Sequence, residues 1–91
     1  MNKERRKELS KVNFLLNRAI GDIDDAKEIL EACKDDEESC YDNLPESVQD
    51  SERGEAMQEN VSNLEEAFDS IEDMSDTIQE AIDSIQEAID R

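Results

Sequence analysis

Eight acidic side chains in the C-terminal third of the chain are spaced alternately by three and four residues. They are Glu66, Asp69, Asp73, Asp76, Glu80, Asp83, Glu87 and Asp90. On a helix, this spacing forms one continuous row in which neighbours lie about 5–6 Å apart. No Lys or Arg occurs between Arg53 and Arg91, although each like-charge pair at i,i+4 costs about 0.2–0.5 kcal/mol. We call these eight residues the acidic row.

The acidic row has two interpretations, and the sequence leaves both open. Phosphates along one DNA strand advance about 3.4 Å of helix axis each, so a carboxylate row of similar pitch copies the charge of a nucleic-acid backbone. Such a row would bind a basic protein surface. In the second interpretation the row is the solubilising face of an acidic helix.

A second acidic cluster, residues 35–38, consists of Asp35, Asp36, Glu37 and Glu38. These residues lack the alternating oxygen ligands, the glycine and the closing glutamate of a calcium-binding EF-hand, and so does the segment 21–28. We therefore predict no metal site and no cofactor. We interpret the cluster as an extension of the acidic surface to the end of a helical hairpin.

The chain offers little to catalysis or to redox chemistry. It has no His, the commonest general base, and long helices form poor pockets, so we predict a protein that is not an enzyme and has no catalytic residues. Cys33 and Cys40 are seven residues apart, about 10.5 Å along a helix, which is too far for a disulfide. We interpret them as small, reduced core residues.

Two heptad patterns position these side chains. In the C-terminal half, positions a and d are almost all apolar, and position g holds Ala or Met: a is Val61, Phe68, Ser75, Ile82 and Ile89, d is Leu64, Ile71, Ile78 and Ile85, and g is Ala67, Met74, Ala81 and Ala88. In the N-terminal half, one seam position is Leu9, Leu16, Ile23 and Leu30, interrupted later by Glu37. We assign the other seam position to Val12, Ala19, Ala26, Cys33 and Cys40. Four sustained repeats indicate long helices.

A proline-marked turn separates the two patterns. Pro45 cannot lie in a helix interior, so we predict helices at about 4–42 and 52–90 with a turn at 43–51. The second helix starts either near Pro45 or after Ser51. The chain is thus predicted to be a single all-α domain, residues 1–91, forming a coiled-coil-like antiparallel hairpin. We expect Ala26 to face Phe68.

The width of the apolar stripe predicts that the hairpin associates with further helices. A stripe over a, d and g is wider than a two-stranded seam needs, so we expect the hairpin to dimerise into a four-helix bundle. Truncating a seam residue to Ala is then expected to cost about 2–5 kcal/mol. The seam residues for which we expect this cost are Leu16, Ile23, Leu30, Phe68, Ile71 and Ile78.

Net charge narrows the class of partner. The 91 residues carry a formal charge of −17, which repels nucleic acid and anionic membranes. The first 18 residues nevertheless contain six bases and two acids, and we expect them to pair with the acidic C-terminal end of the hairpin.

No apolar run is long enough to span a membrane. The start of the chain lacks the apolar region of a signal peptide, so we expect a cytoplasmic protein.

The segment LPESVQDSERGEAMQENVSNLEEAFDSIED and the repeats after it resemble a group of small helical proteins of bacteriophages, prophages and mobile elements. The resemblance covers the turn and the C-terminal half. In size and charge the chain also resembles phage DNA mimics that block restriction enzymes and CRISPR nucleases. We therefore expect an accessory protein of such an element, acting in the bacterial cytoplasm by occluding a nucleic-acid-binding surface of a host defence protein. A scaffolding module and an acidic chaperone for a basic partner are the alternatives.

Overall fold

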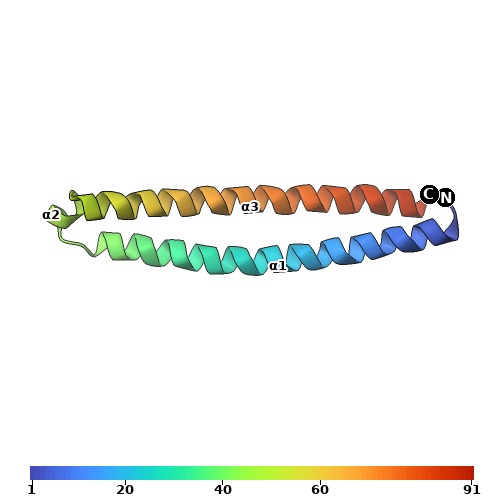
Figure 1. Ribbon diagram of the computed structural model, residues 1–91, viewed down its shortest axis with the longest axis horizontal. Coiled ribbons are helices and arrows are strands. Elements are labelled where there is room, and N and C mark those ends of the chain that lie inside the picture. The colour runs from blue at the N-terminus through green and yellow to red at the C-terminus, as the bar shows by residue number, and fades with distance from the viewer.

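The computed structural model describes all 91 residues as two long helices and one helical turn. The elements are α1 (Lys3–Asp42), α2 (Glu46–Gln49) and α3 (Glu52–Asp90). Helices α1 and α3 run antiparallel side by side, with both termini at one end and α2 at the other (Figure 1). The molecule is a rod with extents of 69 × 15 × 13 Å. The predicted all-α antiparallel hairpin is confirmed.

The ends of α1 follow from local sequence. Asn2 caps the start of the helix, because its Oδ1 accepts a hydrogen bond of 2.7 Å from the backbone N–H of Arg5, which satisfies a free N-terminal donor. At the other end the backbone N–H of Asn43 donates to the Ser39 carbonyl at 3.1 Å. Pro45 disfavours helical geometry at Leu44, so the chain leaves the helix there.

The tip of the hairpin is held by close backbone contacts. The side-chain amide of Gln49 donates to the Tyr41 carbonyl at 3.0 Å, which ties α2 to the last turn of α1. Gly54 is buried in the first turn of α3, and a Cβ there would overlap the backbone of Gln49, at 2.7 Å from its Cα. The long second helix therefore restarts after Ser51, and Pro45 caps only the single turn of α2.

The seam of α3 matches the heptads of the sequence, whereas the seam of α1 is rotated from the predicted one. Half-buried and buried positions alternate by three and four along α1 and into the turn: Arg6, Leu9, Asn13, Leu16, Ile20, Ile23, Lys27, Leu30, Lys34, Glu37, Tyr41 and Leu44. The predicted seam position that begins at Leu9 is thus correct. The predicted second seam position is wrong, because Val12, Ala26, Cys33 and Cys40 are exposed and Ala19 is only half-buried.

Lysine stems explain part of this rotation. Lys27 and Lys34 can lay their aliphatic stems along the seam while their ammonium groups reach water, and they fill more of the space beside α3 than Ala or Cys would. The Nζ atom of Lys27 lies 5.2 Å from the centre of the Phe68 ring, a cation–π contact. Lys27 rather than Ala26 therefore faces Phe68, and the cysteines are not core residues.

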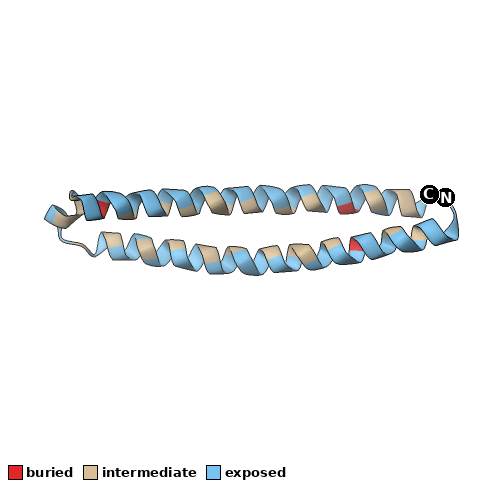
Figure 2. Ribbon diagram, in the orientation of Figure 1, coloured by how far each residue is buried: buried red, intermediate tan, exposed pale blue.

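Burial in the hairpin is thin. Half-buried residues follow the facing sides of α1 and α3, and only three residues are buried (Figure 2). Ile82, 7% exposed, is the single buried hydrophobic side chain. In a hairpin of two helices, each seam residue is covered only by the facing helix. Leu16, Phe68 and their neighbours are therefore half-exposed. Because the loss on truncation scales with the apolar area buried, the isolated hairpin supports a smaller cost than about 2–5 kcal/mol.

Neither long helix contains a stretch that is both apolar enough and long enough to cross a bilayer.

Candidate functional site

The acidic row lies along the outer surface of α3. All eight of its residues are exposed, because positions b and f of the heptad lie opposite the seam positions a and d. From Glu66 to Asp90 the helix rises about 36 Å. The structure therefore brings the predicted row together as one linear surface, parallel to the long axis of the rod.

No basic side chain neutralises the acidic row. The molecule has two ion pairs, Lys11 with Glu8 at 3.2 Å and Lys34 with Asp35 at 3.3 Å, and both lie within α1. Two carboxylates of the row instead accept hydrogen bonds from neutral amides one turn earlier. Gln79 donates to Asp83 at 3.0 Å, and Gln86 donates to Asp90 at 3.1 Å.

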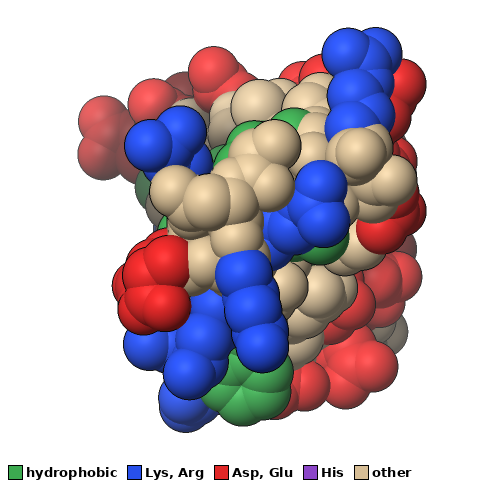
Figure 3. Space-filling view, turned by 90° about the vertical axis from the view of Figure 1, so that its right-hand side faces the viewer, with side chains coloured by type: hydrophobic (Ala, Val, Ile, Leu, Met, Phe, Trp, Pro, Cys, Tyr) green, Lys and Arg blue, Asp and Glu red, His purple; other side chains and the backbone are tan.

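The basic start of α1 lies beside the end of α3 without pairing with its acids. Figure 3 looks onto this end of the rod and shows Lys and Arg side chains gathered there, with Asp and Glu along the sides. The expected ion pairs between the first 18 residues and the acidic C-terminal end are absent. The reason is geometric, because the acids at this end of α3, Asp83, Glu87 and Asp90, are exposed at positions b and f, opposite the seam. The Nε atom of Arg6 is buried without a hydrogen-bond partner.

The predicted acidic cluster at residues 35–38 does not form one patch. Glu37 turns into the seam, where its Oε2 accepts a hydrogen bond of 2.9 Å from the Asn60 side chain. Asp35 pairs with Lys34, while Asp36 and Glu38 are exposed. No group of three or more Cys, Asp or Glu side chains is arranged to hold a metal ion.

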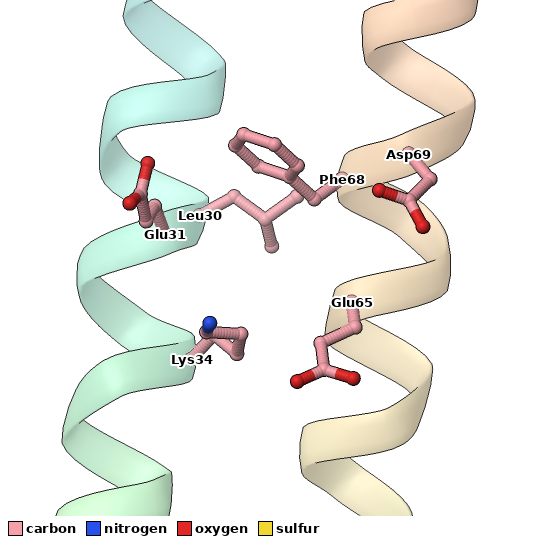
Figure 4. A pocket seen from close by; sticks show the side chains of 6 residues that line it. All are labelled: Leu30, Glu31, Lys34, Glu65, Phe68 and Asp69. Atoms are coloured by element: carbon pink, nitrogen blue, oxygen red, sulfur yellow. The ribbon is translucent and has the colours of Figure 1, made fainter.

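A shallow groove between the long helices surrounds Lys34. Its lining comes from both helices and is mostly charged (Figure 4): Leu30, Glu31, Lys34, Glu65, Phe68 and Asp69. The pKa of Lys34 is raised above 10.5, first by its hydrogen bond to the Asp35 carboxylate and further by the negative charges of Asp35, Glu38 and Glu65. The groove thus holds one cation, Lys34, among carboxylates of both helices, and its ion pair is with Asp35 of α1.

The structure also reveals an apolar surface on the flank of the hairpin. In an antiparallel pair the g positions of both helices border the same side of the seam, and the e positions border the other side. On the g side, α1 exposes Val12, Leu15 and Ile29, at 40%, 59% and 67%, and α3 exposes Met74 at 48%. We call the following set the apolar side face: Val12, Leu15, Ala19, Ala26, Ile29, Cys33, Cys40, Ala67, Met74, Ala81 and Ala88.

Sequence reasoning placed half of this face correctly. It assigned the Ala and Met residues of α3, and Leu15 and Ile29 of α1, to the flank of the stripe. It assigned the other α1 residues of the face to the seam: Val12, Ala19, Ala26, Cys33 and Cys40. The signal that it missed is the heptad position on the other side of the seam residues Leu9, Leu16, Ile23 and Leu30. There Ile20, Lys27 and Lys34 form an alternative heptad position with longer side chains.

Comparisons of the chain with protein-family models, with curated proteins and with solved structures found no match.

Proposed function

We propose that the chain is an accessory protein of a phage or mobile element that occludes a basic, nucleic-acid-binding surface of a host protein. Under this proposal it acts in the bacterial cytoplasm on a defence enzyme, such as a restriction or CRISPR nuclease. The observation that carries the proposal is the acidic row: eight exposed carboxylates on one helix face, none of them in an ion pair.

The energetics of the row favour a role outside the hairpin. The seam of α3 is complete without these acids, and their mutual repulsion opposes folding. A partner groove lined with Lys and Arg would relieve that repulsion and release bound counterions. Binding would therefore be fast and would weaken steeply with salt, as nucleic-acid binding does.

Displacement from DNA tests this proposal. Host proteins retained on DNA-cellulose at low salt are challenged with increasing concentrations of the chain, and the eluted proteins are measured. The proposal predicts selective elution of one or a few DNA-binding proteins, lost when salt rises from about 50 to 200 mM. If no protein leaves the DNA at any concentration of the chain, the proposal is wrong.

A second candidate function is a scaffolding module that joins itself or another helical protein. The exposed apolar side chains of α1 favour it, because isolated surface hydrophobics are common but a contiguous stripe along a helix indicates an interface. Charge reversal in the acidic row would leave the cellular role of such a module intact.

A further inference from the structure

Helix α3 carries no charged side chain on the side that contributes to the apolar side face. Between residues 60 and 88, its g and c positions hold only small or uncharged side chains: Asn60, Asn63, Ala67, Ser70, Met74, Thr77, Ala81, Ser84 and Ala88. All the acids of this stretch lie at positions b, e and f. In a chain with 27 acidic residues, a continuous charge-free strip indicates a surface that meets protein rather than water.

Helix α1 contributes the large side chains of the same surface. Leu15 and Ile29 are more than half exposed, and neither is needed to close the hairpin. One flank of the hairpin thus carries Leu15 and Ile29 on α1, with Asp22 between them at the same heptad position, beside small side chains on α3. A surface of this kind can complement itself if α1 of one copy lies over α3 of another.

We propose that the apolar side face binds a second copy of this chain to form a four-helix bundle with both hairpin tips at the same end. The two-fold axis then runs along the rod. Within the hairpin, Asn13 lies beside Ile82 and Lys27 beside Phe68. If α1 of one copy and α3 of the other keep this axial alignment, Leu15 lies against the partner's Ala81 and Ile29 lies against the partner's Ala67. Large side chains then fill the spaces beside small ones.

Charge supports the same arrangement. Lys11 pairs only with Glu8 of its own helix, and Arg18 pairs with no carboxylate. Both lie on the outer edge of α1, which in the dimer runs beside the outer edge of the partner's α3. The C-terminal part of the partner's acidic row lies at that level. The dimer would therefore supply the contacts between basic and acidic ends that the hairpin alone does not make.

The available area is large enough for a stable dimer. From residue 12 to residue 40, α1 rises about 42 Å, and the rod is 15 Å wide. The face therefore covers roughly 600 Å² on each copy, or about 1,200 Å² in total, which exceeds the approximately 1,000 Å² expected of a specific interface.

Two matched substitutions test the face by sedimentation equilibrium of the full chain. Ile29→Lys places a charge on the apolar side face, whereas Phe14→Lys makes the same change in charge at a side chain of similar exposure, 62% against 67%, on the other flank of α1. We expect the native chain and Phe14→Lys to be dimers at micromolar concentration, and Ile29→Lys to raise the dimer Kd at least about tenfold. A monomeric native chain, or equal Kd values for the two variants, overturns the proposal. Circular dichroism checks that both variants stay helical.

A spin label at the tip tests the direction of the two hairpins. Ser47 is exposed on α2 and is changed to Cys in a Cys33→Ala, Cys40→Ala background. With both tips at one end, the distance between the two labels is on the order of two to three helix spacings of 8–10 Å. A distance approaching the 69 Å length of the rod would show opposed tips and refute the proposed arrangement. The dimer does not depend on the proposed function, because neither experiment involves a partner protein.

Discussion

At the scale of single residues, Asn13 is the least expected member of the seam. It is 6% exposed, and its side-chain amide donates to the Ile82 carbonyl at 3.2 Å and to the Gln86 side chain at 3.5 Å. Its Oδ1 atom has no partner. A buried Asn in a seam fixes register at a cost in stability, because only one alignment of α1 and α3 satisfies its amide.

Replacing Asn13 with Leu should therefore raise stability and weaken register. We expect Asn13→Leu to increase the free energy of unfolding by about 1–2 kcal/mol, because it removes an unsatisfied buried oxygen and adds apolar contact. Urea unfolding followed by circular dichroism measures the change. Ser62→Leu is the control, since Ser62 is exposed on the outer side of α3. A loss of stability in Asn13→Leu would show that the two hydrogen bonds outweigh the unpaired oxygen.

The raised pKa of Lys34 predicts that the hairpin loses stability at high pH. Its pKa in the folded chain lies above 10.5 because of Asp35 and the surrounding acids, so its contribution to stability is complete below the unfolded pKa. That contribution disappears as the pH rises through the higher folded value. We expect the Tm of the native chain to fall more steeply above about pH 10.5 than the Tm of Lys34→Met. Lys7→Met, at an exposed lysine, should keep the native slope, and parallel curves for all three proteins would contradict the assignment.

At the scale of elements, the boundaries of the helices could be predicted and the rotation of α1 could not. The heptads, Pro45 and Ser51 define where the helices begin and end through local geometry alone. The rotation depends on which flank of Leu9, Leu16, Ile23 and Leu30 packs against α3. Both flanks repeat every seven residues, so periodicity cannot distinguish them. The choice rests on packing against Phe68 and Ile82, which only the structure shows.

The two glycines differ in the space that the structure leaves for a side chain. Gly21 is exposed, and a Cβ added there would meet no atom within 4 Å, whereas a Cβ at Gly54 would collide with the backbone of Gln49. We expect Gly21→Ala to stabilise the hairpin by about 0.5–1 kcal/mol and Gly54→Ala to destabilise it by about 1–3 kcal/mol. Denaturant unfolding of both variants checks this, and shifts of the same sign would contradict the close approach of α2 to α3.

At the scale of the whole molecule, repulsion among the acids dominates. The formal net charge is −17, and only two ion pairs offset it. The linear form of the acidic row could be predicted because a helix converts spacing directly into a surface. The absence of neutralising bases could not, because it depends on which way the acids of α3 face once the hairpin has closed.

Salt should therefore act on folding and on partner binding in opposite directions. Neighbouring acids lie about 5–6 Å apart, within the Debye length of about 10 Å at 0.1 M salt, so added salt screens their repulsion. We expect the Tm of the chain alone to rise with NaCl, by several degrees between low and high salt, in a thermal melt. A Tm that falls with NaCl would show that attractive charge pairs stabilise the fold.

The most direct test of the central claim compares two charge reversals in the DNA-cellulose displacement assay. Asp76→Lys with Glu80→Lys alters the acidic row, while Asp24→Lys with Glu28→Lys makes the same charge change at the same spacing on α1, where both acids are exposed. If the acidic row is the binding surface, the row variant loses displacement by about tenfold or more and the α1 variant retains most of it. Equal activity of the two variants would contradict the claim and leave the row as a solubilising face.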